Sequence, residues 1–226
     1  MSKLKVALLG GSFNPSTIAH LRMGRQLLNK EKVDKVVYIP CGPRADKPNL
    51  IPGFHRIQFL KQDLEQYFGY PISIIDSDDP ESLHRANQVV IDDYEVEKFK
   101  KIMPTSWLIQ KYQSTFKDIH FRPVIGGDLI ESMRSWEDYE EVLQHQDFVV
   151  FERDEREIEI SRLPKKHDLI IDKKISKISS TNVRAIIQEK WNPEKQQWYP
   201  NMKEELFRYI SPNVLDYIIE NRLYVN

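Results

Sequence analysis

Cysteine is almost missing from this 226-residue sequence, because Cys41 is the only one. A single thiol excludes an intrachain disulfide and a cysteine-rich metal site. It fits a reducing compartment, so we expect a cytoplasmic location, with a nuclear one left open. No apolar run approaches the roughly 18 residues that a membrane-spanning helix needs. The 33 basic and 34 acidic residues give a formal charge of −1, so we expect neither a nucleic-acid partner nor a membrane partner.

Glycine is also scarce, with eight residues, yet four of them form two pairs, at positions 10–11 and 126–127. Glycine is used where the backbone turns tightly or approaches another group closely. Each pair follows an apolar run, at residues 4–9 and 119–125, that is typical of a buried strand. The two pairs are therefore candidates for close approach to a ligand.

Apolar runs alternate with amphipathic stretches along most of the chain. We expect strands at residues 4–9, 34–40, 70–76, 119–125, 146–151 and 168–171. We expect helices at residues 17–30, 54–68, 94–117 with an interruption near Pro104, 137–144, 180–188 and 212–221. This alternation predicts an α/β fold, a Rossmann-like, mainly parallel sheet flanked by helices, with a C-terminal helical cap. We treat residues 1–226 as one domain, whose helical part begins at about residue 180.

The segment Gly10–His20, GGSFNPSTIAH, combines a strand end, a glycine pair, an Asn-Pro turn and a helix start that carries His20 in its first turn. The glycines let backbone N–H groups come close to a ligand, and the helix start offers unpaired N–H groups and a positive dipole end. The pattern is neither a P-loop nor a dinucleotide-binding fingerprint. It predicts a phosphate site, against the plainer alternative of a strand–turn–helix corner with a satisfied histidine.

A second segment, Ile178–Arg184 or ISSTNVR, is typical of a capped helix start. Arg184 follows Ser180 by four residues, so both lie on the same face of the first turn. Hydroxyls, free N–H groups and a guanidinium that converge on one spot form an anion site. The alternative is a capped surface helix with a solvated arginine.

Together the two segments resemble the two signatures of the nucleotidyltransferases of the HxGH superfamily, Gly-Ser-Phe-Asn-Pro-x-Thr-x-x-His at 11–20 and Ile-Ser-Ser-Thr-x-x-Arg at 178–184. Thr17 stands where other branches carry their first histidine, which is typical of the nicotinamide/nicotinate mononucleotide adenylyltransferase family. The following Leu21-Arg22 resembles the eukaryotic-like branch of that family.

The resemblance implies transfer of AMP from ATP to nicotinamide or nicotinate mononucleotide, giving NAD or deamido-NAD plus pyrophosphate. Mg²⁺ would arrive on the ATP phosphates, and no protein metal site is expected. The segment KPNLIPGFHR at 47–56 resembles the family's lysine-containing loop, which implies that Lys47 reaches the nucleotide phosphates, and for Arg56 we expect a structural pairing role. Matched motifs imply catalytic roles for His20, Lys47 and Arg184. They imply ATP binding by Gly11, Ser12, Phe13, Thr17, His20, Lys47, Gly126, Asp128, Ser179, Ser180, Thr181 and Arg184. They imply mononucleotide binding by Ser12, Phe13, Asn14, Tyr94, Trp107 and Trp136.

Two other functions stay open at this point. The first is another nucleotidyltransferase of the superfamily, such as a phosphopantetheine adenylyltransferase, which shares the first signature. The second is a non-catalytic, chaperone-like member. Residues 189–203 resemble an insertion, for which we favour a small satellite core or an oligomer contact, and a homo-oligomer is left open. The sequence does not choose between the amide and the acid of the pyridine substrate.

Overall fold

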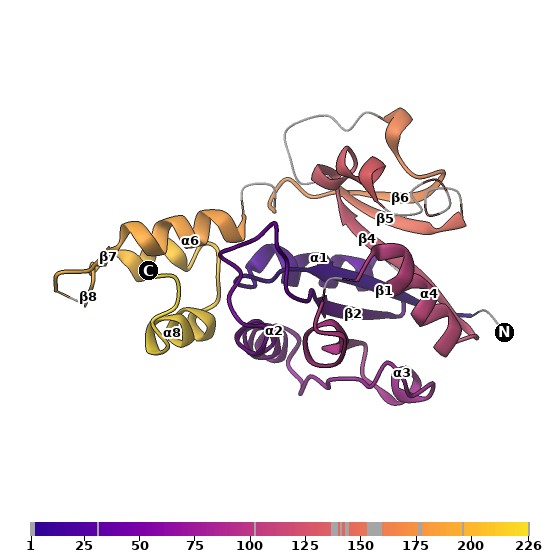
Figure 1. Ribbon diagram of the computed structural model, residues 1–226, viewed down its shortest axis with the longest axis horizontal. Helices are drawn as coiled ribbons and strands as arrows, with labels where there is room; N and C mark the ends of the chain where they lie inside the picture. The colour runs from indigo at the N-terminus through magenta and orange to yellow at the C-terminus, as the bar shows by residue number, and fades with distance from the viewer. Residues whose placement is uncertain are drawn as a thin grey trace.

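A six-stranded parallel sheet forms the centre of the protein in a computed structural model (Figure 1). The structure describes residues 3–30, 32–101, 103–136, 140, 142, 145–152, 160–175, 178–195 and 197–225. The strand order is β3-β2-β1-β4-β5-β6. The strands are β1 (Leu4–Gly11), β2 (Lys35–Pro40), β3 (Val89–Ile91), β4 (Ile119–Gly126), β5 (Asp147–Glu152) and β6 (Lys166–Ile171). The predicted α/β fold with a mainly parallel sheet is confirmed.

The chain first builds outward from β1 to β3, and then returns to place β4 on the other side of β1. The gap between the carboxyl ends of β1 and β4 is therefore the topological switch point, where ligands bind in such sheets. Both glycine pairs lie there, because β1 ends at Gly11 and β4 ends at Gly126.

Helices cover both faces of the sheet, which explains why β1 is apolar without alternation. Ala7 and Leu9 belong to one buried cluster, with residues of α1 (Ile18–Asn29) and α2 (Gly53–Phe68). Val6 and Leu8 belong to a second cluster, with residues of α4 (Thr105–Thr115) and of the short helix α3 (Ser82–Arg85). Successive residues of β1 thus face opposite layers.

The last part of the chain forms the predicted helical cap, with α6 (Ser180–Glu189), α7 (Met202–Leu206) and α8 (Pro212–Glu220). These helices share a buried cluster that also includes Phe59 of α2. The insertion folds as a small antiparallel hairpin, β7 (Trp191–Asn192) and β8 (Gln197–Trp198), followed by the start of α7. The rings of Trp191 and Trp198 meet edge to face at 4.8 Å. In Figure 1 the hairpin lies at the end of the cap that is remote from the sheet.

One predicted strand, residues 70–76, is wrong. Pro71 has no N–H to donate, and the segment makes only an isolated bridge between Ile74 and Ile91. The neighbouring strand is β3, which has three residues and is not among the predicted strands. The predicted helix 94–117 divides near Pro104, as expected, into a π-helical turn at Glu95–Phe99 and α4.

One further expectation, the helix at 137–144, falls mainly on residues outside the described part of the chain. Among the helices that are described, none combines the length and apolarity needed to cross a bilayer.

Candidate functional site

A cavity of about 1180 Å³ opens at the switch point between β1 and β4. Its walls come from the segment after β1, the first turn of α1, the loop at 44–50, the segment after β4 and the first turn of α6. Thirteen of the sixteen residues with a predicted catalytic or binding role line it: Gly11, Ser12, Phe13, Asn14, His20, Lys47, Gly126, Asp128, Trp136, Ser179, Ser180, Thr181 and Arg184. The three predicted catalytic residues are thus brought to one cavity.

The two signature segments touch each other directly. The Ser180 hydroxyl donates to the Pro15 carbonyl over 2.7 Å. The Arg184 guanidinium donates to the Asn14 carbonyl over 2.7 Å and to the Thr181 hydroxyl over 3.2 Å. Residues about 170 positions apart in the sequence therefore fix each other at the start of two helices.

His20 is held by the residue that caps its own helix. The Thr17 backbone N–H donates to His20 Nδ1 over 3.0 Å, and the Thr17 hydroxyl lies 2.9 Å from the same atom. A backbone N–H can only donate, so Nδ1 is an acceptor and the neutral ring carries its proton on Nε2. A protonated Nε2 is the form that a hydrogen bond to a phosphate oxygen requires. Thr17 itself is fully buried and acts here through His20.

The position of the Phe13 ring explains why residue 11 is a glycine. Its backbone has φ of 45°, and its buried ring meets the His20 ring edge to face at 5.0 Å. A Cβ on Gly11 would lie 3.0 Å from the end of the Phe13 ring. Glycine at position 11 therefore lets this aromatic ring pack against the loop and support the histidine.

Lys47, on the loop at 44–50, adds a cation to the site. Its ammonium donates to the Ser12 hydroxyl over 2.6 Å. Burial, and next the positive charge of Arg44, lower the pKa of Lys47, and Arg184 acts in the same direction. These cations are therefore close enough to repel one another, which favours an anionic ligand between them.

Arg56 has the structural role expected of it, because it is 1% exposed and bonds to three backbone carbonyls. It donates to Ser12 over 3.0 Å, to Cys41 over 2.8 Å and to Ile51 over 3.1 Å. It thereby ties the segment after β1 to the loop that carries Lys47.

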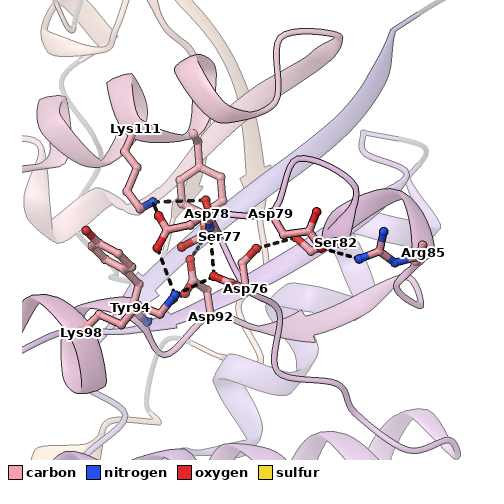
Figure 2. A network of polar contacts seen from close by, with 11 residues as sticks. Asp76, Ser77, Asp78, Asp79, Ser82, Arg85, Asp92, Tyr94, Lys98 and Lys111 are labelled. Carbon is pink, nitrogen blue, oxygen red and sulfur yellow. Dashed lines mark hydrogen bonds and ion pairs between the residues drawn. The ribbon is translucent and has the colours of Figure 1, made fainter.

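Tyr94 and Trp107, two predicted mononucleotide-binding residues, do not line this cavity. They line a second hollow of about 670 Å³. The Lys111 ammonium lies 4.1 Å from the centre of the Tyr94 ring. Figure 2 shows Tyr94 beside Lys111 in a network in which Asp78 pairs with both Lys98 and Lys111. Trp107 is 47% exposed, because α4 buries Leu108 and Ile109 on its other side.

The cavity also has walls that the sequence did not assign. Arg44, Glu95 and the stretch Met103–Thr105 at the start of α4 are part of it. The carboxylate of Glu95 is buried and accepts the N–H of Gly42 over 3.1 Å and of Met103 over 3.2 Å. Glu95 thus joins the segment after β2 to the start of α4. Within the described residues, no group of three or more His, Cys, Asp and Glu side chains could hold a metal ion.

Comparison with known proteins adds the following. Residues 8–186 match the model of the cytidylyltransferase-like family. A probable nicotinate-nucleotide adenylyltransferase of Caldicellulosiruptor bescii is 30% identical over 82% of this chain and 88% of its own length. One of Fusobacterium nucleatum is 28% identical over 83% of this chain and 89% of its own length. The solved Plasmodium falciparum nicotinic acid mononucleotide adenylyltransferase, complexed with NaAD, has a TM-score of 0.74 at 23% identity, covering 98% and 97% of the two chains.

Proposed function

From the premise that this chain belongs to the cytidylyltransferase-like family, we propose that it transfers AMP from ATP to a pyridine mononucleotide, releasing pyrophosphate. One observation carries the proposal most strongly. The two signature segments, with His20 and Arg184, meet at a single cavity at the switch point of the sheet. The contacts between these segments bring two helix starts into one site, as transfer between two anionic substrates requires.

The reaction forms a bond between a 5′-phosphate oxygen of the mononucleotide and the α-phosphorus of ATP. The bond from the α-phosphorus to the bridging oxygen breaks, and its electron pair leaves with pyrophosphate. A phosphate monoester is already ionised near pH 7, so the nucleophile needs no general base. The main task of the protein is to hold two anionic groups together and to stabilise the charge on the leaving group.

We assign these tasks to the groups that converge on the cavity. His20 donates through Nε2 to the triphosphate, because Nδ1 is occupied by Thr17. Lys47 and Arg184, which both line the cavity, would bind the phosphates. Mg²⁺ would be carried in by the ATP phosphates, which suits a small cation that keeps several of its waters. It would add to the neutralisation of the phosphate charge.

We propose nicotinate mononucleotide as the preferred acceptor. The curated relatives are described as nicotinate-nucleotide adenylyltransferases. In this chain the cavity wall includes Trp136, an aromatic face for a pyridine ring, and Thr105, the first residue of α4. Free N–H groups and the positive dipole end at a helix start favour an anionic substituent over a neutral amide.

The test is a parallel steady-state assay with ATP and either nicotinate mononucleotide, nicotinamide mononucleotide or phosphopantetheine. Pyrophosphate release is followed, and the product is identified by chromatography and mass. We expect deamido-NAD to form with the highest kcat/KM. Turnover with phosphopantetheine alone would identify the chain as a different nucleotidyltransferase. No pyrophosphate with any acceptor would favour the non-catalytic alternative.

A further inference from the structure

Asn14 is a junction between three parts of the protein. Its side-chain amide donates to the Asn49 carbonyl over 3.0 Å, and its own backbone carbonyl accepts from Arg184 over 2.7 Å. Its side-chain oxygen accepts the N–H of Ile51 over 3.4 Å and the hydroxyl of Tyr224 over 2.9 Å. Asn14 thus connects the loop that carries Lys47, the start of α6 and a residue that follows α8.

The orientation of the Asn14 amide follows from its partners. The Asn49 carbonyl can only accept, so it faces the NH₂ group of Asn14. The backbone N–H of Ile51 can only donate, so it faces the oxygen. The Tyr224 hydroxyl lies next to that same oxygen and is therefore the donor in this bond.

Tyr224 is held in place for this contact. Its backbone has φ of 66°, the left-handed region that non-glycine residues seldom adopt. Its ring packs against the buried cluster of the helical cap. Burial raises the pKa of Tyr224, so the hydroxyl keeps its proton, while the nearby charges of Arg184 and Arg56 act in the opposite direction.

We propose that Tyr224 is a positioning residue for the nucleotide site, acting through Asn14. It is not among the residues that line the cavity, so its effect on the reaction must pass through another group. Without the hydroxyl, the Asn14 oxygen keeps only the 3.4 Å bond from Ile51. The amide then loses the shortest of its three side-chain hydrogen bonds, and the Lys47 loop is held less firmly relative to Arg184. The proposal rests on the proposed function, because the position of the Lys47 loop relative to Arg184 matters only if these two cations bind phosphates.

Tyr224→Phe tests the proposal with little risk to the fold, because the ring stays in the cluster. Tyr217→Phe is the matched control. Tyr217 belongs to the same cluster on α8, and its hydroxyl lies 2.9 Å from His55 Nδ1. For Tyr224→Phe we expect kcat/KM for ATP to fall about tenfold, the upper range for one lost hydrogen bond. Tyr217→Phe should leave kcat and KM unchanged. The melting temperatures of both variants should fall by similar small amounts.

Combining the substitution with Lys47→Ala separates positioning from general loosening. If Tyr224 acts by placing Lys47 and Arg184, the loss of kcat/KM caused by Tyr224→Phe must be smaller once Lys47 has been removed. The effects of substitutions at interacting residues are not additive. An undiminished penalty in the Lys47→Ala background would overturn the proposal. So would wild-type kinetics in Tyr224→Phe, which would leave the proposed function standing.

Calorimetric titration with a non-hydrolysable ATP analogue keeps the two proposals distinguishable. Weaker analogue binding in Tyr224→Phe, with normal binding in Tyr217→Phe, would support the positioning role even if the wild-type chain released no pyrophosphate. Equal analogue affinity in both variants and the wild type would overturn it.

Discussion

We expect the wild-type protein to lose stability as the pH rises through weakly acidic values, because of Asp63. Asp63→Asn should not show this loss. Asp63 lies on α2, is 1% exposed and accepts hydrogen bonds from the hydroxyls of Ser16 and Ser211. Ser16 precedes the helix of His20, and Ser211 caps α8. Burial raises the pKa of Asp63 from 3.8 to about 6, against the opposing effect of the two hydroxyls.

The sign and size of the effect follow from that difference. Between pH 3.8 and about 6 the native state keeps a proton that the unfolded state has released. The free energy of unfolding therefore falls as the pH rises through this window and stays lower above it. A difference of about two units corresponds to about 3 kcal/mol, at 1.36 kcal/mol for each unit. Asparagine does not titrate, and its amide can still bond to two serine hydroxyls, which donate or accept.

The assay is urea unfolding of the wild type and Asp63→Asn at several pH values from about 4 to 7. We expect the stability of the variant relative to the wild type to rise by about 3 kcal/mol across this range. Asp216→Asn is the control, since Asp216 is an exposed carboxylate on α8 that pairs with Lys203. Exposed pairs contribute less than about 1 kcal/mol. Parallel profiles for the wild type and Asp63→Asn would refute the reasoning.

Three further outcomes can be measured on the site and on the residues beside it. His20→Ala should lower kcat by about 10²–10³, the cost of one transition-state donor, and a near-normal kcat would remove His20 from the mechanism. Because burial and Arg44 lower the pKa of Lys47, ATP binding at alkaline pH should take up a proton. Calorimetry in buffers of different ionisation enthalpy would detect the uptake, and an undiminished uptake by Lys47→Met would contradict this assignment. Gly42→Ala would place a Cβ 1.9 Å from the Lys101 carbonyl oxygen, so it should cost about 1–3 kcal/mol in thermal unfolding. Gly10→Ala, whose Cβ would meet nothing within 4 Å, should unfold like the wild type.

The sequence predicts most of the sheet because strands such as β1, β2 and β5 are buried on both faces and are therefore mostly apolar. β1 and β4 are the clearest cases, since each ends at a glycine pair. The prediction fails at residues 70–76, where an apolar run follows a proline and makes only one bridge to β3. β3 itself is too short, at three residues, for a periodic signal. The local pattern thus identifies the longer strands, including β6 at one edge, and fails at the short strand β3 on the other edge.

The site was predictable where a residue acts through its own helix start, as His20 and Arg184 do. It was less predictable where packing decides which way a side chain points. Tyr94 and Trp107 occupy suitable sequence positions, yet Lys111 covers one ring and the packing of α4 turns the other outward. The contact between Tyr224 and Asn14 spans 210 positions. No local pattern encodes such a contact, because it depends on how the cap packs against the first signature.

The hydroxyls of the second signature differ in what they can offer a phosphate. The Ser180 hydroxyl donates its hydrogen bond to the Pro15 carbonyl, so this side chain joins the two helix starts. Ser179 accepts the N–H of Asn182, and Thr181 accepts from Arg184, so both still have an O–H to donate. Arg184 uses one nitrogen on Asn14 and one on Thr181, but a guanidinium has five N–H donors. Under the proposed function, Ser180 therefore fixes the geometry of the two helix starts, and we expect Ser179, Thr181 and Arg184 to bind the charge of the ligand.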